Sequence, residues 1–203
     1  MNFKTEQENF WAGKFGSNYI NRNNSEKLLY SKMLMWGKIL KSTCNIKSIK
    51  EFGCNIGLNL VALNKLNSEF LLTGYEINKD AVNEASKYNI AKIFNKSILE
   101  KITEKPSDLT FTVGVLIHIN PDYRNLVYDN LVSNSKRYVV IVEYYNPSPV
   151  DIIYRGHKDK LFKRDFAGEL IEEYGLNLVD YGFLYRRDKL TPQDDLTWFL
   201  LEK

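Results

Sequence analysis

The chain has 203 residues, of which 44% are hydrophobic and 13% aromatic, and this composition favours a globular domain over a disordered chain. The formal net charge of +3 is too small to indicate a nucleic-acid partner. Cys44 and Cys54 form no disulfide framework or zinc pattern, and with two histidines in the whole chain we expect no bound metal. No apolar run reaches the ~18 residues of a membrane span, and no signal-peptide pattern is present, so we expect a cytoplasmic protein without a membrane partner.

At this length we expect one domain, residues 1–203, with an N-terminal arm and helix over 1–45 and a core over 46–203. Residues 1–24 show little helical or strand periodicity but contain aromatic residues and glycines, namely Phe10, Trp11, Phe15, Tyr19, Gly13 and Gly16. Two interpretations stay open: static packing of an arm, or a lid that closes over a ligand and excludes water. In the second, Trp11 and Tyr19 contact the substrate.

The first regular element is a predicted helix that begins at Asn24–Ser25, both good capping residues. Apolar residues recur along it at spacings of four, three and four, namely at Leu29, Met33, Trp36 and Leu40. This stripe indicates a face that packs on the core.

Residues 46–61, IKSIKEFGCNIGLNLV, predict a strand, a tight turn and a helix. This layout is typical of a cofactor site in an open α/β sheet, where the ligand lies beyond the carboxyl end of the strand. Gly53 allows a sharp turn. A dinucleotide fingerprint would need further glycines where Asn55 and Leu58 stand, and a phosphate-binding loop would need Gly-Lys-Ser/Thr, so both are disfavoured.

An acid two residues before Gly53 and a glycine four residues after it instead resemble motif I of S-adenosylmethionine (SAM) methyltransferases, although Asn55 replaces the usual central glycine. The resemblance implies SAM as cofactor and S-adenosylhomocysteine (SAH) as product. It places Glu51, Gly53, Asn55 and Gly57 at the cofactor.

A second acid has the spacing that a ribose contact requires. Residues 70–77 predict a buried strand ending at Glu76, about 20 residues beyond the first glycine, where a carboxylate can accept both ribose hydroxyls. The alternative is that Glu76 caps a helix or lies in a solvated turn. A helix from Asn78 to Tyr88 and a short strand over 92–94 follow. Ser97 then lies where methyltransferases commonly contact adenine, or is a plain loop serine.

Residues 108–117 form a nearly continuous apolar run, as expected of a central parallel strand. The run resembles the fourth strand of the methyltransferase sheet, and this resemblance makes Gly114 and Val115 candidates to line the cofactor site. His118 follows, and a helix begins at Asn120–Pro121 and runs to Leu131. Because imidazole titrates near neutral pH, His118 is the first candidate for a general base, the alternative being a structural histidine.

Residues 137–145 predict the fifth strand, whose end carries Tyr144, Tyr145 and Asn146. Tyrosines here can face the sulfonium methyl group, and Tyr144 is the second candidate base; surface packing is the alternative. Residues 146–164 predict a basic loop, inserted after the fifth strand, that recognises the substrate. In it, Arg155 and Lys158 are the first candidates for binding a carboxylate or phosphate, although a charge run can also be a solvated face.

The last helix is predicted to begin at Asp165 and to end at Gly175, followed by strands over 178–185 and 196–201. We therefore expect an α/β fold, the Rossmann-like class I methyltransferase: a mostly parallel seven-stranded sheet with helices on both faces and a C-terminal antiparallel hairpin.

Several stretches together resemble the methyltransferases associated with pseudaminic acid biosynthesis: FWAGKFGSNYINRN, EFGCNIGLNL, GYEIN, TVGVLIHINPD, EYYNPSPVDIIYRG and LFKRDFAGEL. The resemblance implies methyl transfer to an oxygen or nitrogen of an acidic sugar or nucleotide-sugar. Three alternatives stay open: a macromolecular acceptor, a SAM-binding protein without catalysis, and an NAD-linked sugar enzyme.

Overall fold

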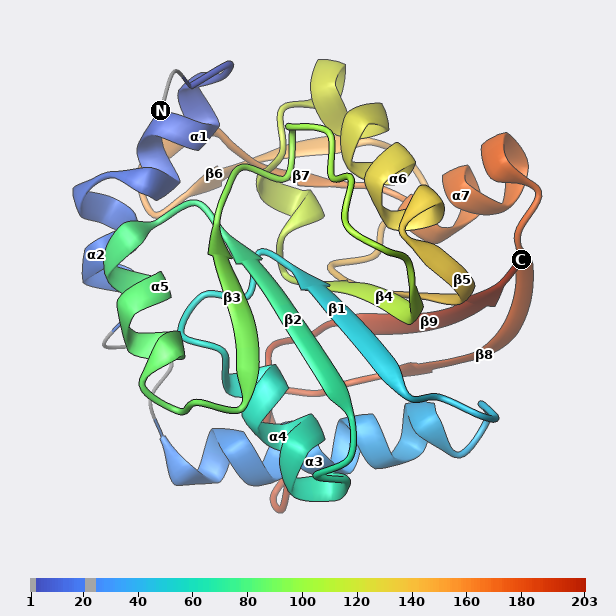
Figure 1. The fold of residues 1–203 in the computed structure, drawn as a ribbon. Helices are drawn as coiled ribbons and strands as arrows, with labels where there is room; N and C mark the ends of the chain where they lie inside the picture. The colour runs from blue at the N-terminus through green and yellow to red at the C-terminus, as the bar shows by residue number, and fades with distance from the viewer. Residues whose placement is uncertain (1–2, 21–24) are drawn as a thin grey trace.

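The computed structural model describes residues 3–20 and 25–203, and its centre is a seven-stranded sheet of order β3-β2-β1-β4-β5-β9-β8 (Figure 1). The first five strands are parallel, whereas β9 runs antiparallel to β5 and β8 antiparallel to β9. Their bounds are β1 Ser48–Phe52, β2 Leu71–Glu76, β3 Ala91–Asn95, β4 Ser107–Val113, β5 Ser135–Glu143, β8 Asn177–Phe183 and β9 Thr197–Glu202. The expected fold class and terminal hairpin are confirmed.

Helices cover both faces of the sheet (Figure 1). One face packs against α3 (Glu26–Leu40) and α4 (Leu58–Leu66), and the other against α6 (Arg124–Ser133) and α7 (Phe166–Tyr174). Helix α5 (Lys79–Ser86) joins β2 to β3. In the described part of the chain, no helix is long and apolar enough to cross a membrane.

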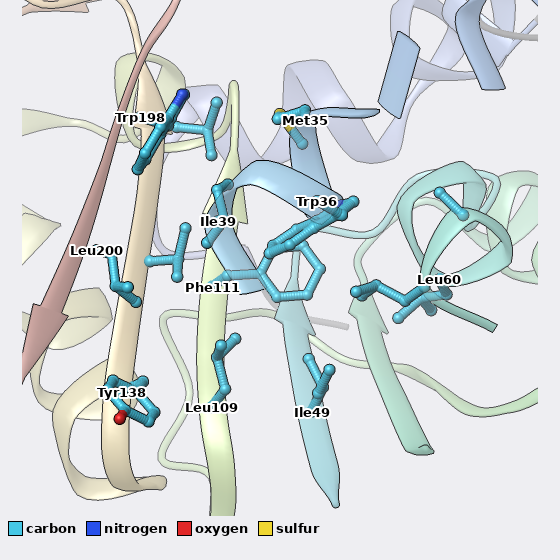
Figure 2. Close-up of a cluster of buried hydrophobic side chains, with 14 of the residues drawn as sticks. Met35, Trp36, Ile39, Ile49, Leu60, Leu109, Phe111, Tyr138, Trp198 and Leu200 are labelled. Atoms are coloured by element: carbon cyan, nitrogen blue, oxygen red, sulfur yellow. The ribbon is translucent and has the colours of Figure 1, made fainter. Parts of the chain in front are cut away.

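The apolar stripe of α3 enters the core, as predicted. Trp36 is fully buried, and its ring lies 4.5 Å from that of Phe111 on β4, measured between ring centres (Figure 2). Ser25 caps this helix by accepting a hydrogen bond from the backbone N–H of Leu28. Asn24, the other predicted capping residue, lies outside the described residues.

The strand order places the ligand crevice. The chain steps outward from β1 through β2 to β3, then crosses to the opposite side of β1 to form β4. In such a sheet, ligands bind beyond the carboxyl ends of the strands where the order reverses, because the loops on either side diverge there. The loops after β1, β2 and β4 therefore surround the expected cofactor site.

The N-terminal segment corrects a prediction. Little regular structure was expected before residue 25, but the chain forms α1 (Glu6–Ala12) and α2 (Lys14–Tyr19), which we call the N-terminal cover. Helix α1 begins with a capping box in which Thr5 and Glu8 satisfy each other's backbone N–H groups. Figure 1 shows both helices near the carboxyl ends of β1 to β3.

Two further predictions are wrong in their details. Strand β4 ends at Val113, not at residue 117, because Gly114 turns with a φ of 65° into the 3-10 helices Leu116–His118 and Pro121–Tyr123. The basic insertion is not a loop but a separate antiparallel hairpin, β6 (Val150–Tyr154) and β7 (His157–Lys163). The predicted ends of α7 are confirmed: Asp165 caps its start, and Gly175 follows it with a φ of 67°.

Candidate active site

A cavity of about 300 Å³ opens beyond the carboxyl ends of β1, β2 and β4, beneath the N-terminal cover. Twelve of the sixteen residues expected from the sequence line it: Trp11, Tyr19, Glu51, Gly53, Asn55, Glu76, Ser97, Gly114, Val115, His118, Tyr144 and Arg155. The segments after all five parallel strands thus converge on one space, as the strand order requires.

The turn after β1 is shaped by the loop after β4. Gly53 has a φ of 79°, and a Cβ there would lie 2.7 Å from a methyl carbon of Val115, so only glycine allows this contact. Asn55 has a φ of 49°, a left-handed conformation that asparagine tolerates better than most residues, which explains how it can stand in the place of a glycine. Gly114 faces open space.

Glu76 organises the turn after β2. Its two carboxylate oxygens accept backbone hydrogen bonds from Asn55 and Asn78, both at 2.8 Å. Burial raises the pKa of Glu76, and these N–H groups oppose the shift. Each carboxylate oxygen can accept a further hydrogen bond, so Glu76 can still receive two hydroxyl groups from the cavity.

Glu51, near the end of the neighbouring strand β1, lies in a short chain of polar side chains. Lys32 Nζ on α3 donates to Asn59 Oδ1 at 2.9 Å, and Asn59 Nδ2 on α4 donates to Glu51 Oε1 at 2.6 Å. Glu51 is 1% exposed, and its Oε2 has no hydrogen-bond partner among the described residues. Burial raises the pKa of Glu51 to about 8, so this carboxyl group holds a proton at neutral pH until a cation approaches it.

Hydrogen bonds attach the N-terminal cover to the segments that follow β2 and β3. Ser97 donates from its hydroxyl group to Glu8 of α1, and both residues are buried. Asn78 caps α5 through its Oδ1, while its Nδ2 donates to the backbone carbonyls of Trp11, Ala12 and Gly13 at 3.1 to 3.3 Å. One side chain therefore links the turn after β2 to the cover.

The cover also contacts the hairpin β6–β7. Glu6 forms an ion pair with the buried Lys160 at 2.8 Å, and Gln7 donates to the backbone carbonyl of Asp159 at 2.9 Å. Phe10 and His157 lie with their ring centres 5.0 Å apart. The cover and the hairpin thus meet over the cavity.

His118 lies below this junction. Its ring centre is 4.6 Å from that of Trp11 and 4.9 Å from that of Tyr154, and its Nδ1 lies 2.6 Å from the carbonyl oxygen of Lys160. Because a carbonyl only accepts, Nδ1 carries the proton. Burial lowers the pKa of His118 to about 4, so the imidazole is neutral at physiological pH and its Nε2 has a free lone pair.

The remaining wall is aromatic and charged. Tyr144 lies near the carboxylate of Asp194, and burial together with this charge raises the pKa of Tyr144 above its usual range, which makes it a poor base. Arg155 occupies the hairpin turn with a φ of 51°, and its guanidinium lies 5.5 Å from the centre of the Tyr154 ring. A cationic group therefore reaches an otherwise aromatic part of the cavity.

The backbone that carries His118 is held from β5. One carboxylate oxygen of Glu143 accepts the backbone N–H groups of Val115 and Leu116 at 2.9 and 3.1 Å. Burial raises the pKa of Glu143 to about 7, opposed by these hydrogen bonds. Glu143 thus fixes the turn that leads from Gly114 to His118.

Four expected residues are not among those that line the cavity. Gly57 lies against Ala85 of α5, and Tyr145 is exposed beside Phe199. Asn146 donates to the carbonyl of Ser148, and Lys158 is exposed on the hairpin. Conversely, the cavity includes polar residues that the sequence did not single out, namely Thr5, Gln7, Glu8, Lys32, Asn59 and Asp194.

Among the described residues, no group of three or more histidine, cysteine, aspartate or glutamate side chains could hold a metal ion.

No protein-family model matches the sequence, and comparison with curated proteins gives no match. Solved structures do match. The magnesium protoporphyrin IX methyltransferase of Synechocystis PCC 6803, solved with bound SAM, has a TM-score of 0.73 at 10% identity, with 100% of both chains covered. The 1,6-didemethyltoxoflavin-N1-methyltransferase of Burkholderia thailandensis, solved with its substrate and SAH, has a TM-score of 0.76 at 12% identity, covering 100% of this chain and 91% of that one.

A third similar structure is an O-methyltransferase of a Brevibacillus brevis polyketide synthase with SAH, with a TM-score of 0.66 at 14% identity, covering 98% of this chain and 80% of that one. The likeness extends over the whole sheet and its helices, so the chain has the Rossmann-like fold of SAM-dependent methyltransferases.

Proposed function

We propose that the protein is a SAM-dependent methyltransferase that acts on an oxygen or nitrogen of an anionic small molecule. The observation that carries the proposal is one cavity with two chemically different ends. Buried carboxylates stand at the end formed by the turns after β1 and β2, and a neutral, hydrogen-bonded histidine stands at the end formed by the cover and the hairpin.

The cofactor end suits SAM. Glu51 Oε2 is buried and has no hydrogen-bond partner among the described residues, and the methionine ammonium of SAM would donate to it once Glu51 has given up its proton. Glu76 would accept the ribose hydroxyls, and Ser97 and Glu8 would border the adenine. Open space at Gly114 leaves room beside the sulfonium. SAM supplies an activated methyl group, so the protein's contribution is mainly to position the acceptor.

His118 is the proposed base. Its Nδ1–H is held by the Lys160 carbonyl, so Nε2 can accept a proton from an acceptor hydroxyl or amine as the new bond to carbon forms. Trp11 and Tyr154 pack around the imidazole and exclude water. Holding the nucleophile ~3 Å from the methyl carbon, in line with the bond that breaks, is worth several orders of magnitude in rate.

The acceptor is proposed from charge and from resemblance. Arg155 gives the acceptor end a guanidinium, which binds carboxylate or phosphate in a bidentate fashion. The sequence stretches that resemble pseudaminic-acid-associated methyltransferases favour an acidic nine-carbon sugar, its nucleotide-activated form or a precursor. The similar solved structures are named for other small molecules, a porphyrin and a toxoflavin precursor.

Two measurements test the proposal. Calorimetric titration with SAM, SAH and NAD should show binding of the first two and none of NAD. Mass spectrometry of acidic sugar pools incubated with the protein and methyl-labelled SAM should then show one sugar that gains a single labelled methyl group. Binding of NAD instead of SAM would refute the cofactor. SAM binding without a labelled sugar would redirect the search to a macromolecular acceptor or a non-catalytic role.

A further inference from the structure

Strand β8 forms one edge of the sheet (Figure 1), and its side chains carry an apolar surface that remains exposed. Helix α7 packs over β5 and β9 on one face of the sheet, where Leu201 is fully buried. One strand further out on the same face, Tyr181 and Phe183 are 64% and 60% exposed. The ring of Tyr181 stacks on that of Phe199 of β9, with ring centres 6.3 Å apart. A row of aromatic side chains therefore continues to the edge of the sheet.

The backbone of β8 has hydrogen-bonding groups that point out of the sheet at this edge. Leu184 donates its N–H to the carbonyl of Leu196, so these two residues form a hydrogen-bonded pair of the antiparallel ladder. Because hydrogen-bonded and non-hydrogen-bonded pairs alternate, Gly182 also bonds toward β9, whereas the backbone groups of Tyr181 and Phe183 point outward. In the described part of the chain no further strand pairs with β8 on that side.

A local contact agrees with this orientation and shows which groups stay available. The N–H of Tyr181 donates to Asp180 Oδ1 at 2.9 Å, and so does not point toward β9. The outward N–H of Phe183 and the outward carbonyls of Tyr181 and Phe183 remain for another strand. Exposed aromatic rings and outward backbone groups thus occur at the same residues.

The two edges of the sheet differ in their protection against pairing. At the opposite edge, β3 carries Lys92, whose ammonium group lies 4.8 Å from the centre of the Phe94 ring. A lysine on an edge strand discourages pairing with another chain, because pairing would remove water from its charge. Strand β8, NLVDYGF, has no lysine or proline. Its one charged side chain, Asp180, lies on the other face, where Ser42 donates to it at 2.7 Å.

An antiparallel edge strand is complementary to a second copy of itself. A two-fold axis perpendicular to the sheet near Phe183 brings the N–H of Phe183 in each copy to an outward carbonyl of the other. Tyr181, Phe183 and Tyr185 of one copy then lie beside the same residues of the other as cross-strand aromatic pairs. Since β8 has no charged side chain on this face, the contact brings no like charges together.

The exposed area is large enough for a specific contact. Five apolar side chains at this edge are 38% to 64% exposed, namely Leu178, Val179, Tyr181, Phe183 and Tyr185. Since a large aromatic side chain has an area of ~200 Å², these five leave roughly 450 Å² exposed in each copy. Two copies together with their strand backbones reach about 1,000 Å², the lower limit for a specific protein interface.

We propose that the protein forms a symmetric dimer in which the β8 strands of two copies pair antiparallel and join the two sheets into one. None of the residues from Leu178 to Tyr185 lines the cavity. The dimer contact is therefore separate from the candidate active site, and it does not depend on the proposed function.

Sedimentation velocity of the full chain across the micromolar range should show a monomer that passes into a dimer as the concentration rises. Phe183→Lys should raise the Kd of the dimer by about 100-fold, because two-fold symmetry places the substitution in the contact twice and each costs about tenfold. Leu71→Lys is the matched control, because Leu71 is 71% exposed on β2, far from β8 in the strand order. It should dimerise like the wild type.

Hydrogen exchange distinguishes pairing of the strand edges from stacking of the aromatic faces. The amide proton of Phe183 should exchange rapidly in dilute solution and slowly above the Kd of the dimer, whereas that of Leu184 is bonded within each copy and should be slow at both concentrations. Circular dichroism melts establish that each variant is folded.

Three results would each overturn the inference. The first is a wild type that stays monomeric at every concentration. The second is a dimer that folded Phe183→Lys leaves unchanged, or that Leu71→Lys weakens equally. The third is exchange at Phe183 that does not depend on protein concentration.

Discussion

Replacing Glu76 by glutamine tests the proposed cofactor site. The wild-type carboxylate already accepts two backbone N–H groups, from Asn55 and Asn78, and offers its remaining lone pairs to the cavity. Glutamine has the same shape but only one acceptor oxygen. One of the two backbone N–H groups then faces an amide nitrogen, and one ribose hydroxyl loses its acceptor.

The magnitude follows from the bonds removed. A hydrogen bond to a charged group contributes about 1.5–3 kcal/mol, so loss of one ribose contact should weaken SAH binding by roughly 10- to 100-fold. The unpaired backbone N–H should also lower the free energy of unfolding by about 1–3 kcal/mol. Calorimetry with SAH and urea unfolding measure the two effects separately.

Two controls make the result specific. Glu84→Gln alters an exposed carboxylate on α5 that pairs only with Lys87 among the contacts described. This control should change neither the affinity for SAH nor the free energy of unfolding. The 2′-deoxy analogue of SAH lacks one ribose hydroxyl and should bind the wild type more weakly than SAH does. Glu76→Gln should lower the affinity for this analogue only slightly further, because the contact that the substitution removes is already missing. If Glu76→Gln binds SAH as tightly as the wild type while folded, the ribose assignment is wrong.

Three further predictions concern other ionisable residues of the cavity. His118→Gln should slow methyl transfer by about 100-fold or more while leaving SAH binding intact. Because the pKa of His118 lies at about 4, a plot of wild-type kcat/KM against pH should show no inflection from His118 near pH 6.5. An inflection at pH 6.5 that disappears in the variant would contradict this. Arg155→Met should raise the KM for an anionic acceptor about tenfold in steady-state kinetics, and should leave the affinity for SAH unchanged in calorimetry. An unchanged KM would show that Arg155 does not bind the acceptor. In the folded state Glu51 keeps its proton up to about pH 8, whereas in the unfolded state it ionises near its ordinary pKa of 4.5. The contribution of Glu51 to the free energy of unfolding therefore falls as the pH rises from about 4.5 to about 8. Glu51→Gln should therefore gain stability relative to the wild type between pH 5 and pH 8 in urea titrations, yet bind SAH more weakly; a pH-independent difference would refute the raised pKa.

The sheet could be predicted because its strands carry strong local signals. The apolar runs of β4 and β5, with acids at the ends of β1 and β2, fix both the strand type and the edge at which the site lies. The boundaries of α7 followed from Asp165 and Gly175, whose conformational preferences act locally. These features need no tertiary information.

Other features could not be predicted, either because they depend on contacts between distant segments or because their local sequence pattern is weak. The capping box of Thr5 and Glu8 was present in the sequence but stood in a segment without apolar periodicity. Gly156 indicated a possible hairpin turn, but the many charged residues around it favoured a solvated loop, so the hairpin β6–β7 was not predicted. Lys32 and Asp194 carry no motif, and only the packing of α3 and of the β8–β9 connection against the sheet places them at the cavity.

Asn78 contacts both Glu76 and the N-terminal cover, so the stability of α1 and α2 should depend on whether the proposed cofactor site is occupied. Its backbone N–H holds Glu76 in place, while its side-chain amide holds the cover. A ligand that binds only when this arrangement is intact stabilises everything that depends on it, by mass action. Amide protons in α1 and α2 should therefore exchange with solvent more slowly as the cofactor concentration rises, so that hydrogen exchange in the N-terminal cover records occupancy of a pocket formed largely by the rest of the chain.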